Sequence, residues 1–600
     1  MKNKYIALGI MLAGLMSSCK GNQDCFAPDG IYLAQDGKGI YVANRGGNEL
    51  LLFNGDYTTA ERKASFDSPV TDLTFMPDGR MWVVCDGHAG KMYEVDVDAM
   101  EPLSETKIGN SPSAVRYSPC SKSLWVTQRY GNSLLEVSPD GKDVLSSVEI
   151  GREPVDMELF ASDSLLLVVN NLPEMSALDF PVAAQLSVVD VLTKEVVKRI
   201  MLPNGSTDAK SVAVSRGGSY AYVTHLLARY QLPTNQVDRG WMYTNALSVI
   251  DLQNKELLNT VLLDTPQKGT ANPWEVTLSS DNRYVIVAAA GVDELAMIDR
   301  TELHKRFNDA KQGWFKSPST GSWENIPNDA GFLHGIVEYV PTDGKGPRAV
   351  ATAGAKAIAA NYFTGEIVEM DIASREKHVY PSSRPALSST LEGSGNMYFH
   401  DATLCFQGWQ SCASCHPNDA RVDGLNWDLM NDGMGNSKST KSLLYSHQTP
   451  PCMVTGIRKD AETAVRSGIK YILFAAENED ISKAMDAYLM SLSAEPSPYL
   501  VDNELSDAAQ RGKVHFDQHC ASCHSGSYYT DGKLYDVDWA TGSEKGKKMD
   551  VPALTEVWRT GPYLYDGRAA SMRDMLETHG PRQPLTQQEL DDLSEYILSL

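Results

Sequence analysis

Short apolar segments separated by polar turns recur along the first two thirds of the chain. From about Ile31 to Ile372, apolar and polar side chains alternate in stretches that end at Gly, Pro, Asp or Asn. Alternation with a period of two is typical of strands that bury one face. The segments rich in Val, Tyr and Trp return as Met81-Trp-Val-Val, Leu124-Trp-Val-Thr, Ala221-Tyr-Val-Thr and Tyr284-Val-Ile-Val.

The repeat unit has a length of roughly 40 residues and contains four strands, which is the signature of a β-propeller. Each blade of a propeller needs its neighbours to bury its faces. The chain is therefore predicted to be multidomain, beginning with an all-β, seven-bladed propeller over residues 26–378. The repeats resemble the YVTN-type propellers of extracytoplasmic bacterial proteins. An irregular array and a pair of sandwiches are the alternatives, which the even spacing disfavours.

Two long insertions interrupt the repeats. The first runs from His225 to Asn245, and the second runs from Glu302 to about Pro347. Loops of this length inside a regular array are often functional or lie at a domain contact. We therefore expect at least one insertion to cover the segment that follows the propeller.

The pattern changes in the last third of the chain. A stretch rich in Ser and Pro at residues 379–394 predicts a linker. Beyond it, the segments Ala484–Leu492 and Leu593–Leu600 carry apolar residues at helical spacing. Similar segments follow one another in the same order twice, which predicts two all-α domains over residues 395–495 and 505–600.

Each predicted helical domain contains the same pentapeptide, Cys-Ala-Ser-Cys-His. Two cysteines three residues apart, followed by histidine, form the attachment signature of c-type haem. The thiols add to the two vinyl groups of one porphyrin, and the imidazole ligates the iron. A structural zinc site would need four protein ligands, and a Cys-x-x-Cys redox site has no use for the histidine. Two covalent haems are thus predicted, on Cys412, Cys415 and His416 and on Cys520, Cys523 and His524.

The motifs of this region resemble a known family. Besides the two pentapeptides, Val551-Pro-Ala-Leu-Thr-Glu-Val and Thr560-Gly-Pro-Tyr-Leu-Tyr-Asp-Gly-Arg568 resemble segments of the bacterial di-haem cytochrome c peroxidases. The resemblance covers roughly Gly395 to Leu600. It implies an oxidoreductase that reduces hydrogen peroxide, with a peroxidatic first haem and an electron-relaying second haem.

The same resemblance suggests how the irons differ. The family's second haem usually has a distal Met; counting from Gly567, this chain has His579 there, with Met575 one helical turn earlier. The equivalent region after Gly456 offers neither His nor Met, so the iron on His416 is expected to lack a fixed ligand there. His447 and Met453, in the preceding loop, remain candidates for a labile ligand. Cleavage of peroxide needs a proton-moving group, and the candidates are Glu462, Glu477 and Glu479, which are otherwise solvated helix charges.

Two further roles follow from the resemblance alone. Family members place a tryptophan between the haems as an electron conduit, and Trp427 and Trp558 are the candidates, although packing alone would also explain them. Family members also hold calcium between the haem domains. Asn431 and Asn436, in a segment dense in oxygen donors, are the candidate calcium ligands, with a solvated turn as the alternative.

The first residues predict export. Lys2 and Lys4 precede an apolar run that is too short for a spanning helix, and Ser17-Ser18-Cys19 follows it. This arrangement resembles a bacterial lipoprotein signal over residues 1–18, with Cys19 as the lipidated residue. The protein is expected to be extracytoplasmic, as covalent haem attachment requires. It is also expected to be lipid-anchored on a periplasmic or cell-surface face. Ordinary secretory cleavage is the alternative.

Composition narrows the choice of partners. The net charge of −23 argues against nucleic acid, whose phosphates require a basic surface. An acidic surface would attract a basic electron donor such as a small cytochrome. Two other functions remain open: an electron-transfer cytochrome, or oxidant of a propeller-bound partner, without peroxide turnover; and a surface protein whose propeller binds an unknown ligand.

Overall fold

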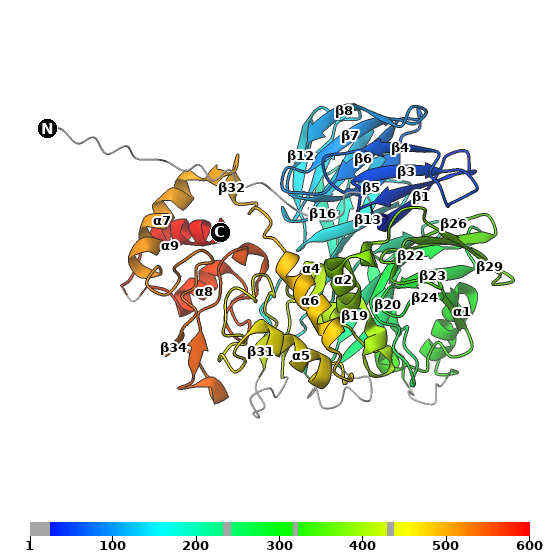
Figure 1. The fold of residues 1–600 in the computed structure, drawn as a ribbon. Coiled ribbons are helices and arrows are strands. Elements are labelled where there is room, and N and C mark those ends of the chain that lie inside the picture. The colour runs from blue at the N-terminus through cyan, green and yellow to red at the C-terminus, as the bar shows by residue number, and fades with distance from the viewer. Residues whose placement is uncertain (1–24, 232–241, 316–321, 429–436, 582) are drawn as a thin grey trace.

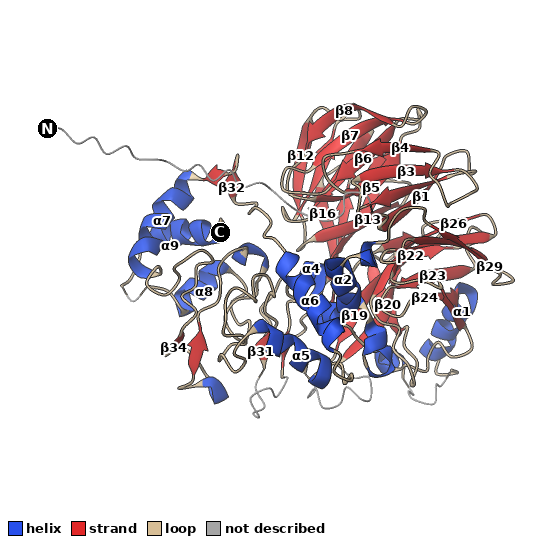
Figure 2. Ribbon diagram, viewed as in Figure 1, coloured by secondary structure: helices blue, strands red, loops and turns tan. Residues whose placement is uncertain are grey.

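The computed structural model describes residues 25–231, 242–315, 322–428, 437–581 and 583–600 (Figure 1). Seven antiparallel sheets form a propeller over the first two thirds of the chain, and the remainder contains helices joined by long loops (Figure 2). The prediction of a seven-bladed propeller is confirmed. None of the helices in these ranges is long and apolar enough to cross a membrane.

Each blade is built from consecutive strands. The first four blades contain β1 Pro28–Leu33, β2 Ile40–Asn44, β3 Glu49–Phe53 and β4 Arg62–Ser65; β5 Val70–Phe75, β6 Met81–Cys85, β7 Lys91–Asp96 and β8 Glu101–Lys107; β9 Pro112–Ser118, β10 Ser123–Gln128, β11 Ser133–Val137 and β12 Val144–Glu149; and β13 Pro154–Phe160, β14 Leu165–Asn170, β15 Gln185–Asp190 and β16 Glu195–Met201.

The last three blades follow the same order, with one extra short strand in the fifth. They contain β17 Ser206–Thr207, β18 Val212–Val214, β19 Tyr220–Ala228, β20 Tyr243–Asp251 and β21 Glu256–Leu262; β22 Pro273–Leu278, β23 Tyr284–Ala289, β24 Glu294–Asp299 and β25 Val337–Pro341; and β26 Pro347–Ala353, β27 Lys356–Asn361, β28 Glu366–Asp371 and β29 Lys377–Pro381.

Carboxylates on the first strands join neighbouring blades. Asp72 accepts a hydrogen bond from the backbone N–H of Val115 at 2.8 Å, and Asp156 accepts one from Val212 at 2.9 Å. Apolar side chains fill the layers between blades, and the rings of Trp82, Trp125 and Tyr222 are wholly buried. Burying a large aromatic side chain is worth several kcal/mol, which is why the strand repeats are rich in Trp and Tyr.

The ring closes without a blade shared between its two ends. Blade one contains only β1–β4 and blade seven contains only β26–β29. The segment after β29 contacts blade one: Phe26 donates its backbone N–H to Pro385 at 2.9 Å, and Arg384 forms an ion pair with Glu49 at 2.6 Å.

The two insertions have different structures. The first lengthens β19 and β20 into a hairpin of two nine-residue strands, longer than the other strands of the propeller. The second contains helix α1 Arg300–Lys311 and the 3-10 turn η2 Trp323–Asn328, between β24 and β25. The apolar face of α1 packs Leu303 and Phe307 against the core of the fifth and sixth blades.

The last third of the chain has two similar halves. The first contains η3 Leu387–Ser389, α2 Leu391–His400, η4 Ala402–Leu404, η5 Phe406–Gly408, α3 Cys412–Cys415, α4 Pro417–Ala420, β30 Asn426–Trp427, β31 Lys438–Ser439, α5 Ala461–Tyr471 and α6 Glu479–Ser491. The second contains β32 Leu500–Val501, β33 Glu504–Leu505, α7 Asp507–His519, β34 Leu534–Asp536, η6 Gly542–Glu544, β35 Lys548–Asp550, η7 Val557–Arg559, α8 Met572–Thr578 and α9 Gln587–Leu598. Helix α2 starts within the stretch predicted as a linker, and short strand pairs occur in both halves predicted to be all α.

Each half is organised around one close helix crossing. A Cβ atom on Gly395 of α2 would lie 1.9 Å from the carbonyl oxygen of Ala484 in α6. A Cβ atom on Gly512 of α7 would lie at the same distance from the carbonyl oxygen of Asp592 in α9. Only glycine allows the two backbones to come this close. Figure 1 shows α2, α4 and α6 between the propeller and the helices α7–α9.

Candidate haem sites

The histidines of the two pentapeptides have the same local geometry. Nδ1 of His416 donates a hydrogen bond to the carbonyl oxygen of Arg421 at 3.3 Å, and Nδ1 of His524 donates one to Tyr529 at 3.0 Å. A carbonyl oxygen can only accept, so each Nδ1 carries the proton and Nε2 is the nitrogen that can ligate a metal. Such a bond orients the imidazole of metal-ligating histidines and raises its basicity.

The first cysteine of each motif lies against an apolar surface. Cys412 packs against a cluster that includes Phe399 and Tyr488, and Cys520 packs against the equivalent cluster around Phe516. Burial raises the pKa of Cys412 to about 12 and that of Cys520 to about 11. These thiols are protonated and held beside apolar walls, which fits a porphyrin edge and not a reactive thiolate.

The second half brings His579 near His524. His579 caps the end of α8, and its ring lies 5.3 Å from the ring of Trp539. Burial lowers the pKa of His524, and the charge of a protonated His579 lowers it further. Met575 lies partly buried in the apolar cluster of the same half. His579 is thus close enough to His524 for their charges to interact, and ligation by His579 or Met575 stays a prediction.

The three glutamates singled out as proton-moving groups are on the surface. Glu477 is paired with Lys470 at 2.7 Å, and Glu479 is paired with Arg466 at 2.7 Å; both carboxylates are more than half exposed. Glu462 lies exposed in the first turn of α5. These contacts match the alternative interpretation, in which the three residues are solvated helix charges.

His447 has a different environment. Its Nε2 lies 3.1 Å from Asp486, which is itself paired with Arg466, and its side chain is 3% exposed. Sequence reasoning could not find the pairing with Asp486, because the two residues lie 39 positions apart on different elements.

The propeller forms one wall of the first haem motif. Cys415 packs against a cluster that contains Tyr243 and Met242 from the first insertion and Trp427 from the first half. Met242 also receives a hydrogen bond from Gln410 at 3.2 Å, and Asn245 donates one to the carbonyl oxygen of Trp409 at 3.3 Å. The prediction that an insertion covers the helical segment is therefore confirmed for the described part of the first insertion.

A buried carboxylate lies at the centre of this wall. Asp423 accepts hydrogen bonds on Oδ2 from the hydroxyl of Tyr243 at 2.6 Å and from the indole N–H of Trp427 at 2.7 Å. Its Oδ1 accepts the backbone N–H of Leu425 at 3.0 Å. Burial raises the pKa of Asp423, while the bonds from Tyr243 and Trp427 oppose that rise. Sequence reasoning named Trp427 and noted Asp423 only as the start of the segment dense in oxygen donors; it missed Tyr243 and the contact between the three residues.

The loop after His416 reaches the face of the propeller. Asn418, Asp419 and Ala420 all have positive φ, between 55° and 64°. Asn418 donates a hydrogen bond to Asn171 at 2.7 Å and accepts one from Lys210 at 3.2 Å. Three consecutive left-handed residues other than glycine are strained, and these contacts with the propeller help to hold them.

A buried ion pair joins the two halves. Arg421, whose carbonyl oxygen holds His416, forms two hydrogen bonds with Glu556, and both side chains are almost fully buried. Glu556 also accepts the backbone N–H of Glu495 at 2.8 Å. The proximal loop of the first motif is thus fixed by a residue of the second half.

The propeller also contacts the second half. Arg152 donates hydrogen bonds to the carbonyl oxygens of Arg559 at 2.9 Å and Gly561 at 2.8 Å. The rings of Trp558 and Tyr130 meet edge to face at 5.0 Å. Trp427 and Trp558 therefore both lie against propeller tyrosines, and their role as electron relays stays a prediction.

Several predicted residues fall outside the described ranges. They are the lipidation residue Cys19 and the calcium candidates Asn431 and Asn436. Among the described residues, no group of three or more His, Cys, Asp or Glu side chains could hold a metal ion.

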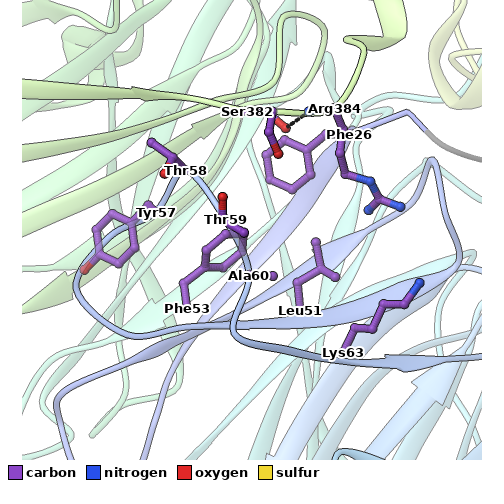
Figure 3. A pocket seen from close by; sticks show the side chains of 11 residues that line it. Phe26, Leu51, Phe53, Tyr57, Thr58, Thr59, Ala60, Lys63, Ser382 and Arg384 are labelled. Carbon is purple, nitrogen blue, oxygen red and sulfur yellow. Dashed lines mark hydrogen bonds between the residues drawn. The ribbon is translucent and has the colours of Figure 1, made fainter.

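A pocket of about 240 Å³ lies elsewhere, at the contact between blade one and the segment that follows the propeller (Figure 3). Phe26, Tyr57 and Arg384 are among the residues that line it. None of its lining residues belongs to either haem motif.

Comparison with known proteins defines the class first. A family model described as Cytochrome c matches residues 509–600. The second pentapeptide therefore belongs to a cytochrome c domain, which implies covalently bound c-type haem. The chain thus combines a seven-bladed propeller with a C-terminal cytochrome c.

The particular relatives are two subunits of one enzyme. The chain is 26% identical over 275 residues to hydrazine synthase subunit gamma of Kuenenia stuttgartiensis, covering 35% of this chain and 78% of that subunit. It is 22% identical over 244 residues to the beta subunit of the same enzyme, covering 40% of this chain and 53% of that subunit. The chain thus spans about half the length of the beta subunit.

A solved structure agrees with the fold. A chain of Kuenenia stuttgartiensis hydrazine synthase superposes with a TM-score of 0.53 at 18% identity, covering 60% of this chain and 100% of that chain. At this identity the match shows the fold alone.

These comparisons correct the predicted activity. Peroxide reduction by a cytochrome c peroxidase-like enzyme is wrong, because the matched relatives are hydrazine synthase subunits and not di-haem peroxidases. The motifs that carried the resemblance specify how haem is attached and how helices pack around it. They do not specify what reacts at the iron. With this correction, Glu462, Glu477 and Glu479 lose the peroxide-cleaving role.

Proposed function

We propose that the chain is an extracytoplasmic oxidoreductase with two c-type haems that acts on small nitrogen compounds, in chemistry related to that of hydrazine synthase. The similarity to both the gamma and the beta subunit of that enzyme supports this function. We infer that one polypeptide here combines parts that are similar to two different subunits of that enzyme.

The observation that carries the proposal is the contact between the propeller and the first haem motif. Tyr243 and Met242 of the propeller pack directly against Cys415. A propeller that served only as a separate ligand platform would not need to supply a wall of a haem site.

The residues have distinct roles in this proposal. Cys412 and Cys415 would hold the first haem and His416 would ligate its iron, while the Arg421 carbonyl fixes the imidazole. Cys520, Cys523 and His524 would hold the second haem, and His579 would be a further ligand to its iron. The haems, when bound, supply the electron-transfer and redox chemistry. The protein orients the ligands and excludes water around the first motif.

Haem content and substrate response test the proposal. The purified protein is expected to contain two c-type haems per chain by the pyridine haemochrome method, and one in a Cys412→Ala/Cys415→Ala variant. Adding hydroxylamine, ammonium or nitric oxide should change the absorption spectrum of the first haem, and hydrazine should be detectable by aldehyde trapping when two of these compounds and a reductant are combined. An absorption spectrum that none of these compounds changes, together with no detectable hydrazine, would refute the nitrogen chemistry.

The predicted partners and location remain part of the proposal. An electron donor that is a small basic cytochrome would suit the acidic chain. Lipid attachment at Cys19 would hold the protein at the membrane. A Cys19→Ala variant is expected to move from the membrane to the soluble extracytoplasmic fraction, and its retention on the membrane would contradict the anchor.

A further inference from the structure

We infer that Tyr243 of the propeller is a positioning residue for the first haem site, acting with Trp427 through Asp423 to set the reduction potential of the haem on His416. The inference rests on the proposed function, because it requires a haem at that motif. It assigns to the propeller a direct part in the redox properties of the site.

The contacts that carry the inference form one hydrogen-bonded unit. Asp423 is fully buried, and a single oxygen accepts both the Tyr243 hydroxyl at 2.6 Å and the Trp427 indole at 2.7 Å. The rings of the two donors lie 4.8 Å apart and pack on each other. The Tyr243 hydroxyl is also within hydrogen-bonding reach of the Cys415 sulfur. The unit therefore adjoins an atom that is covalently linked to the porphyrin when haem is attached.

The hydrogen-bond pattern indicates the charge of the carboxylate. Asp423 accepts bonds from the Tyr243 hydroxyl, the Trp427 indole and the Leu425 backbone N–H. An indole and an amide N–H can only donate, and a carboxyl group that accepts several bonds is stabilised in its ionised form. A buried negative charge beside the haem favours the oxidised iron and lowers its potential.

The two donors moderate that effect. Each donor points a partially positive hydrogen atom at the Asp423 oxygen. It therefore offsets part of the negative charge of this buried carboxylate. Removing one donor should therefore make the carboxylate act as a stronger negative charge on the haem. Neutralising the carboxylate itself should have the opposite effect.

The geometry explains why the fifth blade carries the longest hairpin. Tyr243 is the first residue of β20 and pairs with Ala228 at the end of β19. A β20 strand of ordinary length would begin after this position. The Thr207 hydroxyl, from the same blade, donates a further hydrogen bond to the Asp423 backbone carbonyl at 2.7 Å. The blade thus holds the Asp423 loop from two strands.

The test is a redox titration of the full-length haem protein at pH 8, with the midpoint of the first haem identified by its loss in the Cys412→Ala/Cys415→Ala variant. Tyr243→Phe is expected to lower this midpoint and Asp423→Asn to raise it. Trp427→Phe, which also removes a donor, should shift the midpoint in the same direction as Tyr243→Phe and serves if that variant does not fold. The midpoint of the second haem should stay unchanged in all three variants.

Tyr230→Phe provides the matched control. Tyr230 belongs to the same apolar cluster, but its hydroxyl bonds to Asn204 at 3.0 Å instead of to Asp423. This variant should leave both midpoints unchanged. Shifts of the same sign in Tyr243→Phe and Asp423→Asn, or no shift in either, would overturn the inference. Such an outcome leaves the nitrogen chemistry intact, whereas a protein without haem at His416 would overturn both proposals, so the two failures can be distinguished.

Discussion

Arg421 combines two structural functions in one residue. Its carbonyl oxygen accepts the Nδ1–H bond of His416, and its guanidinium is paired with Glu556 of the other half. Loss of the Arg421–Glu556 ion pair would therefore disturb the position of His416 through Arg421. The arrangement makes the second half a structural support for the first haem motif.

Replacing Glu556 tests this coupling. Glu556→Gln would leave a buried guanidinium without its counter-charge, which typically costs about 3–5 kcal/mol. We expect a clear fall in the free energy of unfolding and in the haem content at the first motif, measured by denaturant titration and pyridine haemochrome. Glu479→Gln, which removes the exposed partner of Arg466, should have little effect on either quantity.

His225 predicts how stability depends on pH. Burial lowers its pKa to about 4, and both ring nitrogens are hydrogen-bonded, to Leu226 and Ser248. Below about pH 6.5 the unfolded chain binds a proton that the folded chain accepts only near pH 4, so stability is full above pH 6.5 and falls between these values. This one group contributes up to about 3 kcal/mol of that loss.

Thermal melts from pH 7.5 to pH 4 would measure the effect. His225→Gln should flatten the decline relative to the parent protein, although it lowers stability at neutral pH. His378→Gln, at an exposed position, is the control and should follow the parent curve. An unchanged slope in His225→Gln would contradict the assignment.

At the residue scale, the haem motifs could be found from sequence because their chemistry is confined to five consecutive residues. Tyr243 and Asp423 could not, since they lie 180 positions apart and meet only in the folded chain. The distal residues could be predicted only in part. Counting along the chain indicated His579, which the structure brings near His524, but the same reasoning chose three exposed glutamates.

At the scale of elements, the helix crossings in the two halves depend on two glycines. Alternating apolar residues predicted the strands, and helical spacing predicted α6 and α9. The closeness of the crossings was not predictable from either pattern, because it depends on the backbone of a distant helix. Gly395 and Gly512 occupy equivalent positions, and each faces a carbonyl oxygen of the partner helix.

Adding a methyl group at one crossing tests its importance. Gly512→Ala would place a Cβ atom against the backbone of α9, so the helices must separate at a cost of about 3 kcal/mol or more. We expect a lower melting temperature and reduced haem at Cys520 and Cys523. Gly468→Ala in α5 meets no atom within 4 Å and should be neutral or stabilising by about 0.5–1 kcal/mol.

At the scale of the whole molecule, the propeller and the helical halves share polar contacts as well as apolar ones. A single side chain, that of Arg152, connects a propeller loop to two carbonyl oxygens of the second half. Asn418 connects the first half to the propeller face. Sequence reasoning predicted the two parts and one covering insertion. It could not predict that both halves would be fixed against the same propeller.

Arg152→Ala should uncouple the parts. It removes charge-assisted hydrogen bonds worth roughly 1.5–3 kcal/mol each. Calorimetry is expected to resolve a separate, earlier transition for the cytochrome c domain in this variant. Arg199→Ala, which removes an exposed pair with Glu174 in the fourth blade, should melt like the parent. Identical profiles for the two variants would show that the Arg152 contacts contribute nothing to coupling.

The closure of the ring has a consequence for biosynthesis. The first and last blades share no strand. Pro385 and Arg384, which contact Phe26 and Glu49, lie between β29 and α2. The segment that connects the propeller to the cytochrome region therefore also contacts the first blade and helps to close the ring. Arg384 and Pro385 follow the last strand in the chain, so these contacts can form only after all seven blades have been synthesised. A protease cut between residues 381 and 384, outside every blade, would separate these contacts from the seventh blade and leave every strand of the propeller intact.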